Sequence, residues 1–176
     1  MGDIIAVTGS LGAAAIGLDS ALQQHHENYS CLSAAVKQAA LNALNYPQAR
    51  IAEGLKLNNI AHSALDLSDG LISDLGHILN ASEVAAEIQL ECLPLSAALS
   101  CLDKEQAWEK ALTGGDDYEL CFTLAKEDWP EVIKYYPEFT AIGTIVAPQA
   151  AQNKLCLLKE NGRQHIIHSR GYDHFA

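Results

Sequence analysis

The sequence predicts an α+β fold, a sandwich in which helices pack against a mixed β-sheet. Short apolar stretches rich in β-branched residues, such as 4–8 and 141–146, are typical of strands, and longer stretches with apolar residues at helical spacing are typical of helices. The two kinds of segment mix without the strict strand–helix–strand alternation of a parallel sheet. The 176 residues, of which 49% are hydrophobic and 19% are charged, suffice for a single globular domain, residues 1–176, with its own core.

The predicted elements follow one another with no internal repeat and no low-complexity linker. Strands are expected at residues 4–8, 63–67, 85–90, 118–124 and 141–146. Helices are expected at residues 13–24, 31–44, 47–57, 71–79 and 128–135, with helical turns at 96–102 and 104–112. Pro47 suits the first turn of the third helix. Residues 154–158 and 165–168 flank Asn161-Gly162, which is a strong signal for a β-hairpin.

The net charge of −11, from 11 Lys and Arg against 22 Asp and Glu, argues against a nucleic-acid partner, because phosphate contacts from basic residues dominate such binding. The same charge repels phosphate ligands unless divalent cations bridge them to the carboxylates. A phosphate-handling function would therefore imply Mg²⁺ or a similar ion. The sequence has no run of about eighteen apolar residues, so a membrane partner is not expected, and its start lacks the basic region of a signal peptide.

The five cysteines are odd in number, are widely spaced and include no CxxC pair. They are Cys31, Cys92, Cys101, Cys121 and Cys156. This usage favours buried, reduced thiols in a cytosolic protein over disulfides or a zinc site.

A short stretch between a predicted strand and a predicted helix, Asp66-Leu67-Ser68-Asp69-Gly70, forms the first candidate site. One interpretation is structural: Ser68 or Asp69 caps the helix and Gly70 makes the turn. In the other interpretation the strand continues to Ser68, and two carboxylates and a hydroxyl lie at a helix N-terminus. Hard cations and phosphate oxygens can both be held at such a place. The spacing alone leaves both interpretations open.

Residues 114–120, with the sequence Gly-Gly-Asp-Asp-Tyr-Glu-Leu, form the second candidate site. The paired glycines allow the backbone to approach a ligand closely, or allow a tight turn into the next strand. Asp116 and Asp117 repel each other, so we expect them either to be solvated in an exposed acidic turn or to meet a cation.

Two further patterns are not assigned a site. Residues 8–12, Thr-Gly-Ser-Leu-Gly, match neither G-x-G-x-x-G nor the Walker A motif, and are expected to serve close packing of a helix against a strand. The seven histidines include no second cluster that would complete a metal site. The sequence supports no Ser/His/Asp or Cys/His constellation, so no catalytic residue is assigned.

Taken together, several stretches resemble the C-terminal domain of thiamine-monophosphate kinases, in the AIR-synthase-related (PurM-like) superfamily. The stretches are residues 2–12 (GDIIAVTGSLG), 66–71 (DLSDGL), 74–78 (DLGHI), 114–120 (GGDDYEL) and 171–175 (GYDHF). The DLSDG stretch is shared with other superfamily members, and its combination with GGDDYEL and GYDHF points to this kinase. The resemblance implies a PurM C-terminal-domain-like sandwich.

The resemblance also implies a cytoplasmic enzyme that uses Mg²⁺ and transfers the γ-phosphate of ATP to thiamine monophosphate, giving thiamine diphosphate. Asp66 and Asp69 would each contact a magnesium ion, and Ser68 would contact the nucleotide. Asp116 and Tyr172 would contact the substrate, with the tyrosine ring against the thiamine heterocycles. Asp116 departs from the family, which usually has a glutamate here, so its carboxylate is drawn back by one methylene.

The family also has an N-terminal domain, which is absent from this chain and supplies most of the magnesium-binding aspartates, further ATP contacts and the usual dimer interface. The expected partners are therefore ATP, thiamine monophosphate, the chain's own N-terminal domain and, in the full-length form, a second copy. Without that domain the chain is expected to be inactive. Two alternatives stay open: another ATP-dependent enzyme of the superfamily, for aminoimidazole ribotide or selenophosphate synthesis, and a non-catalytic module that packs against a partner domain.

Overall fold

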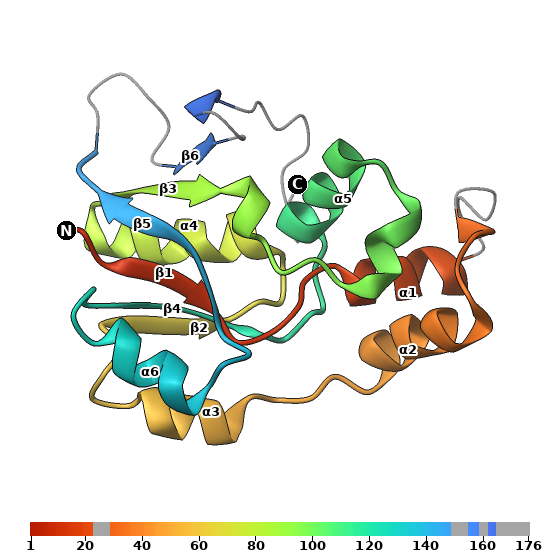
Figure 1. The fold of residues 1–176 in the computed structure, drawn as a ribbon, viewed down its shortest axis with the longest axis horizontal. Coiled ribbons are helices and arrows are strands. Elements are labelled where there is room, and N and C mark those ends of the chain that lie inside the picture. Colours follow the sequence, from red (N-terminus) through yellow and green to blue (C-terminus); the bar gives the residue numbers. More distant parts are fainter. Residues whose placement is uncertain (23–28, 149–154, 159–161, 165–176) are drawn as a thin grey trace.

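The computed structural model describes residues 1–22, 29–148, 155–158 and 162–164, and a mixed β-sheet lies at its centre (Figure 1). The described strands form a six-stranded sheet in the order β2-β4-β1-β5-β3-β6. Neighbouring strands are antiparallel except β3 and β6, which are parallel. The strands are β1 (Ile4–Val7), β2 (Ser63–Asp66), β3 (Ala85–Gln89), β4 (Leu120–Leu124), β5 (Thr140–Val146) and β6 (Leu155–Leu158). The predicted α+β fold with a mixed sheet is confirmed.

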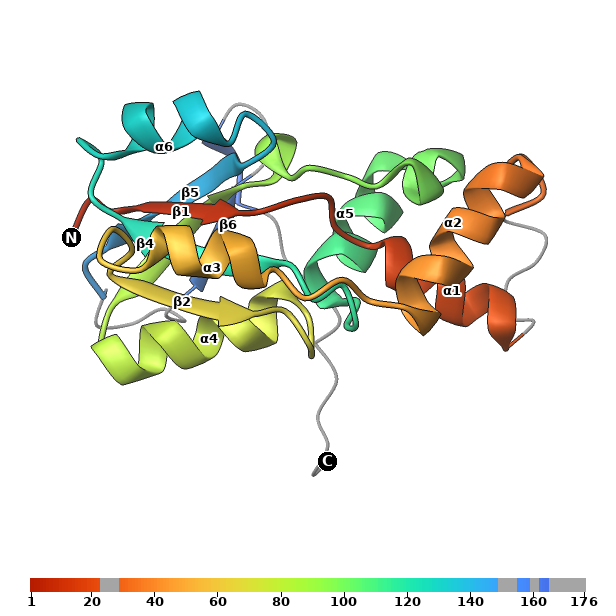
Figure 2. The ribbon, with the colours of Figure 1, turned by 90° about the horizontal axis from the view of Figure 1, so that it is seen from below.

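Helices cover both faces of the sheet and gather beyond one end of it (Figures 1 and 2). The α-helices are α1 (Ala13–Ala21), α2 (Ala34–Asn45), α3 (Ile51–Leu57), α4 (Leu71–Ser82), α5 (Lys104–Thr113) and α6 (Trp129–Tyr135), and η2 (Leu90–Cys92) and η3 (Ala97–Cys101) are 3₁₀-helices. Helices α3 and α6 lie on one face and α4 lies on the other, while α1, α2 and α5 extend from the end at which β1 and β2 finish. Within the described residues, no helix has the length and apolar character that crossing a bilayer requires.

The helix predicted at residues 47–57 begins later than expected, at Ile51, so Pro47 does not lie in its first turn. The residues before Ile51 form an extended connection, which brings the side chain of Arg50 to the carboxylate of Glu119. This ion pair joins residues that are 69 positions apart, and a pattern of neighbouring residues does not reveal it.

The helix predicted at residues 31–44 begins at Ala34, because the hydroxyl of Ser33 accepts a hydrogen bond from the amide of Val36 and caps the helix. The strand predicted at residues 154–158 is present as β6, and it pairs with β3 in parallel. Its predicted hairpin partner, residues 165–168, lies outside the described residues.

The core consists of two clusters, one on each face of the sheet. Side chains alternate along β1: Ile5 and Val7 belong to the larger cluster with α4 and α5, and Ala6 belongs to the smaller one. The smaller cluster also contains Leu57 of α3 and Val132 of α6. The alternation of β1 therefore decides which helices pack on each face.

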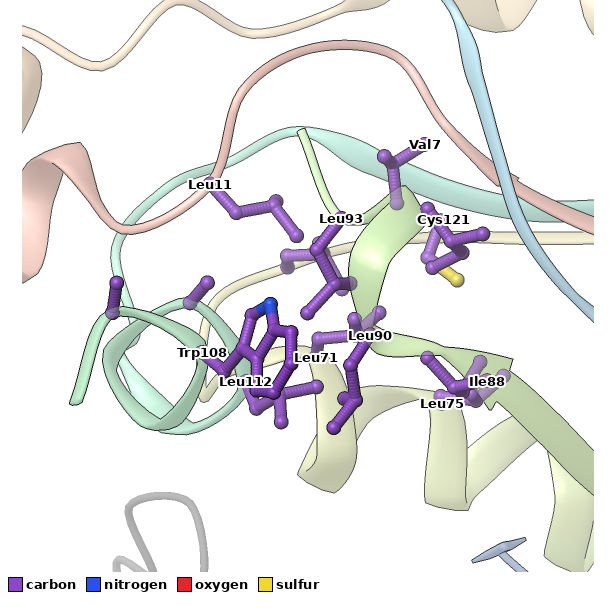
Figure 3. Close-up of a cluster of buried hydrophobic side chains, with 14 of the residues drawn as sticks. Val7, Leu11, Leu71, Leu75, Ile88, Leu90, Leu93, Trp108, Leu112 and Cys121 are labelled. Atoms are coloured by element: carbon purple, nitrogen blue, oxygen red, sulfur yellow. The ribbon is translucent and has the colours of Figure 1, made fainter. Parts of the chain in front are cut away.

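The larger cluster supports the end of the sheet where the helices gather (Figure 3). Trp108 and Leu112 of α5 lie there with Leu71 and Leu75 of α4 and with Leu90, which follows β3, and each of these side chains is at most 3% exposed. Close packing of this kind resists small displacements, so the ends of β2 and β4 rest on a rigid base.

The cysteines differ in part from the sequence expectation. Cys121 is buried and reduced, as expected, whereas Cys92 is exposed. Cys31 and Cys101, whose Cα atoms are 6.0 Å apart, are joined as a disulfide, which corrects the expectation of reduced thiols for this pair. Their sequence separation of 70 residues explains the error, since only the packing of the segment before α2 against η3 brings them together. The side chain of Cys156 lies outside the described structure.

We expect Leu75→Ala to lower the free energy of unfolding by about 2–5 kcal/mol, because it removes a side chain that is 0% exposed and leaves a cavity among α4, α5 and the sheet. Leu55→Ala on α3 is the matched control, since that leucine is 72% exposed, and its effect should stay within about 0.5 kcal/mol. Chemical denaturation followed by circular dichroism measures both. Equal losses in the two variants would contradict the assignment of the larger cluster as the main core.

Candidate functional site

Two connections meet at the end of the sheet nearest α1 and α5, and they contain four of the five predicted site residues. The first, residues 66–70, leads from β2 into α4, and the second, residues 114–119, leads from α5 into β4. We call them the site loops. Because β2 and β4 are adjacent antiparallel strands, the end of one and the beginning of the other lie side by side.

Backbone hydrogen bonds join the two site loops directly. They run from the amide of Asp116 to the carbonyl of Ser68 (3.0 Å), from the amide of Tyr118 to the carbonyl of Leu67 (2.9 Å), and from the amide of Leu67 to the carbonyl of Glu119 (2.8 Å). Gly115 makes this approach possible, since a Cβ atom there would collide with the carbonyl oxygen of Ser68. The two candidate motifs of the sequence therefore form one structural unit.

The carboxylate of Asp74, in the first turn of α4, holds the first site loop. It accepts hydrogen bonds from the amides of Ser68 and Asp69, each at 2.9 Å, and the residue is 5% exposed. Neither Ser68 nor Asp69 caps α4, which corrects the structural interpretation of this stretch: Gly70 is the N-cap and makes no side-chain cap. The carboxylate reaches back from inside the helix and binds the amides of the two residues that precede Gly70.

Asp117, in the second site loop, lies at the N-terminus of α1. Its carboxylate accepts hydrogen bonds from the amides of Gly12 (2.6 Å) and Ala14 (3.3 Å). The sequence left solvent or a cation as the two ways to accommodate Asp117, and the positive end of a helix supplies a third. The amides that a phosphate-binding loop would offer are thus occupied by a protein carboxylate, which agrees with a packing role for residues 8–12.

Both of these carboxyl groups have raised pKa values. Burial raises the pKa of Asp117 to about 6, although hydrogen bonds from the amides of Gly12 and Ala14 oppose the shift. Burial likewise raises the pKa of Asp74 above its ordinary value, and the amides of Asp69 and Ser68 act in the opposite direction.

Glu119 closes the second site loop and is 6% exposed. It accepts a hydrogen bond from the hydroxyl of Thr8 (2.6 Å) and two from the guanidinium of Arg50 (2.7 and 2.5 Å). No role for Asp74, Glu119 or Arg50 was predicted from the sequence. For Asp74 a signal was present, because it lies at helical spacing from Leu71 and Ile78 on the apolar face of α4.

The predicted site residues lie as follows. Asp66 is exposed at the end of β2, and Ser68 and Asp69 are partly buried in the first site loop. Asp116 is partly buried in the second site loop with a φ of 65°, in the left-handed region, which aspartate tolerates better than most residues. Tyr172 lies outside the described residues.

The donor set suits a magnesium ion only in part. Among the described residues, no group of three or more His, Cys, Asp or Glu side chains is arranged to hold a metal ion. Mg²⁺, however, often binds proteins through one or two carboxylates, with waters and substrate phosphates as its other ligands. Asp66 and Asp69 are the two carboxylates that the first site loop offers for binding of this kind.

The mixed sheet, the helices on both faces and the paired acidic loops at one end define the class of this chain as an α+β domain of the PurM-like fold. Residues 1–153 match the family described as AIR synthase related protein, C-terminal domain. The chain belongs to this family, as the C-terminal-domain resemblance implied.

The curated relatives share one name, thiamine-monophosphate kinase. The thiamine-monophosphate kinases of Escherichia coli K12 and of Buchnera aphidicola subsp. Schizaphis graminum are 40% and 38% identical over 99% of this chain. The thiamine-monophosphate kinase of Bacillus subtilis is 32% identical over 98% of it. In each case the match covers 53% of the relative, so the chain spans about half the length of the curated relatives it matches.

Solved structures agree with this family. Thiamine-monophosphate kinase from Stenotrophomonas maltophilia K279a superposes with a TM-score of 0.77 at 36% identity, over 92% of this chain and 51% of that one. AaThiL complexed with AMPPCP and TMP has a TM-score of 0.77 at 29% identity, over 99% of this chain and 52% of that one. Escherichia coli HypE, with a TM-score of 0.61 at 15% identity, shares the fold alone.

We expect Asp117 to titrate near pH 6 in the folded protein, instead of near its ordinary 3.8. Because the raised pKa means that the folded state binds this proton more tightly than the unfolded state, the contribution of Asp117 to stability falls as pH rises from about 4 to about 6. The carboxyl carbon of Asp117, followed by NMR, gives the midpoint. The free energy of unfolding of the wild type, taken relative to Asp117→Asn, should decline over the same range. A midpoint near 4, or a difference that does not change with pH, would contradict the expectation.

Proposed function

We propose that this chain is the C-terminal half of a thiamine-monophosphate kinase, which transfers the γ-phosphate of ATP to thiamine monophosphate and forms thiamine diphosphate. The observation that supports the proposal most is the meeting of the two acidic site loops at one end of the sheet, joined by backbone hydrogen bonds. The relatives that match nearly the whole chain carry this name, and AaThiL binds an ATP analogue and TMP.

In this proposal Asp66 and Asp69 hold magnesium, Ser68 contacts the nucleotide, and Asp116 and Tyr172 contact thiamine monophosphate. Phosphoryl transfer depends on positioning and charge neutralisation more than on covalent chemistry by the protein. The acceptor is a phosphate oxygen that already carries charge near neutral pH, so the reaction needs no strong general base. Bound Mg²⁺ supplies the positive charge that offsets the repulsion between the two phosphate groups.

The positions of the residues support these proposed roles. Asp66 is exposed at the end of β2, so its carboxylate can reach a ligand without leaving a buried partner unsatisfied. Asp116 faces the first site loop through its own backbone amide, which donates to Ser68. A nucleotide held at Ser68 and a substrate held at Asp116 would therefore lie on neighbouring segments, as in-line transfer requires.

The remaining parts of the enzyme belong to the proposal as well. The chain spans about half the length of its relatives, and we propose that an N-terminal domain supplies most of the magnesium ligands, further ATP contacts and the surface of a homodimer. The proposed enzyme acts in the cytoplasm. On this basis the 176-residue chain alone should show no kinase activity.

The test compares the 176-residue chain with a fusion in which the chain follows the N-terminal half of the Escherichia coli kinase, its 40% identical relative. Formation of thiamine diphosphate from ATP, Mg²⁺ and thiamine monophosphate is measured by chromatography. We expect turnover by the fusion and none by the chain alone. A chain that turns over as fast as the fusion would contradict the need for a second half, and a folded fusion that binds neither AMPPCP nor thiamine monophosphate would contradict the function.

In the fusion, Asp66→Asn should lower kcat by about a hundredfold or more, because the loss of one carboxylate ligand weakens the binding of the magnesium ion whose positive charge offsets the repulsion between the phosphates. The matched control is Glu131→Gln, since Glu131 is an exposed carboxylate on α6, whose side chain is 67% exposed. Activity of Asp66→Asn with an unchanged dependence on Mg²⁺ concentration would remove Asp66 from the metal site.

A further inference from the structure

The proposed reaction gives no role to Glu119, although this buried carboxylate of the second site loop accepts three side-chain hydrogen bonds. Its Oε2 accepts from Thr8 Oγ1 at 2.6 Å and from Arg50 Nε at 2.7 Å, and its Oε1 accepts from the NH2 of Arg50 at 2.5 Å. The two contacts from Arg50 are the paired arrangement in which a guanidinium and a carboxylate match best.

These contacts join separate segments of the chain. Thr8 directly follows β1, Arg50 directly precedes α3, and Glu119 is the last residue of the second site loop. Thr8 extends the connection to β4, because its hydroxyl also accepts a hydrogen bond from the amide of Leu120 at 2.9 Å. Gly9 leaves the room for the carboxylate: a Cβ atom at this position would lie 2.5 Å from Glu119 Oε1.

Glu119 also belongs to the contact between the site loops through its backbone. Its carbonyl oxygen accepts the amide of Leu67, which lies between Asp66 and Ser68. A displaced Glu119 would therefore shift residue 67 and, with it, the carboxylate and the hydroxyl on either side. The second site loop itself is held in an uncommon conformation, since Asp116 and Tyr118 both have a positive φ.

Stability alone does not account for this arrangement. A buried ion pair contributes little net stability, because desolvation of the two charges offsets most of their attraction. Its best-attested contribution is to fix one arrangement of segments against alternatives. The partners of Glu119 lie next to β1 and α3, so the arrangement that they fix includes the second site loop, which Glu119 ends.

We propose that Glu119 and Arg50 form a positioning pair that fixes the two site loops against each other and against the end of β1. The pair acts through the loops and does not itself contact the reacting atoms. The inference rests on the proposed function only in taking these loops as the place of phosphoryl transfer.

The chain contains a matched control for a purely structural role. Asp19 of α1 is also 6% exposed, and it likewise accepts from a hydroxyl, Tyr29 Oη (2.5 Å), and from a cation, Lys110 Nζ (2.7 Å). The chemistry of this cluster resembles that of Glu119, but it joins α1, α5 and the segment before α2, and it makes no hydrogen bond to residues 66–70 or 114–119 within the described structure. Asp19→Asn and Glu119→Gln therefore remove the same kind of contact in two places.

The first experiment measures amide hydrogen exchange by NMR in the 176-residue chain and needs no ligand. In Glu119→Gln, the amides of Leu67, Asp116 and Tyr118 should exchange about tenfold faster relative to amides in the β3–β5 pairing, because the loops open locally. In Asp19→Asn, the exchange rate of the same three amides relative to the β3–β5 amides should stay within about twofold of the wild type, even if overall stability falls. An unchanged ratio in Glu119→Gln, or an equal rise in Asp19→Asn, would overturn the proposal.

Two gentler variants guard against loss of folding. Arg50→Lys keeps the positive charge but loses the paired contact, and Gly9→Ala displaces the carboxylate without removing any charge. Both should raise the same exchange ratio in the same three amides. If both leave it at the wild-type value, the pair does not position the loops.

The second experiment measures steady-state kinetics in the fusion enzyme. Glu119→Gln and Arg50→Lys should lower kcat by about tenfold to a hundredfold, with a smaller change in KM for ATP, since misplacement by about 1 Å costs up to that much. Asp19→Asn should stay within about twofold of the wild type per folded molecule. Equal kinetics in Glu119→Gln and Asp19→Asn would overturn the positioning role. An inactive wild-type fusion would count against the proposed function instead, and the exchange experiment would still decide the inference.

Discussion

The candidate site depends on buried or partly buried carboxylates that accept hydrogen bonds from groups on other elements or loops of the chain. Asp74 binds the amides of the first site loop, Asp117 binds the N-terminus of α1, and Glu119 binds the guanidinium of Arg50. Because an unsatisfied carboxylate in a dry environment is strongly unfavourable, each of these contacts restricts the segment that carries it. Together these contacts fix the two site loops, which lie almost entirely outside the helices and strands.

The acidic residues behind the net charge of −11 fall into two groups with different surroundings. Some carboxylates are structural and are neutralised within the fold, by amides or by a guanidinium. Others, such as the exposed Asp66, keep their charge at the surface and can interact with cations. A chain of this kind can approach a phosphate group when divalent ions lie between them, and its relatives are kinases of a phosphorylated substrate.

The rigidity behind the site loops comes from the larger cluster of the core. Leu71 and Leu75 of α4 and Trp108 and Leu112 of α5 pack under the ends of β2 and β4, so the helix that follows one loop and the helix that precedes the other share one base. Interiors packed at this density transmit displacements instead of absorbing them. Two kinds of contact therefore hold the site loops in place: apolar packing of α4 and α5 against the sheet, and the ion pair between Glu119 and Arg50.

The α+β class, the family and most strands and helices, to within a few residues, could be predicted from the sequence alone. The same holds for the location of Asp66, Ser68, Asp69 and Asp116 at or next to element ends. Periodicity and turn chemistry are properties of neighbouring residues, so they can be seen without the fold. The folded structure was needed to find the partners of Asp117 and Glu119, the late start of α3 and the pairing of Cys31 with Cys101. Those contacts span up to 111 positions, and a carboxylate selects its partner only after the sheet has brought distant amides and cations within reach.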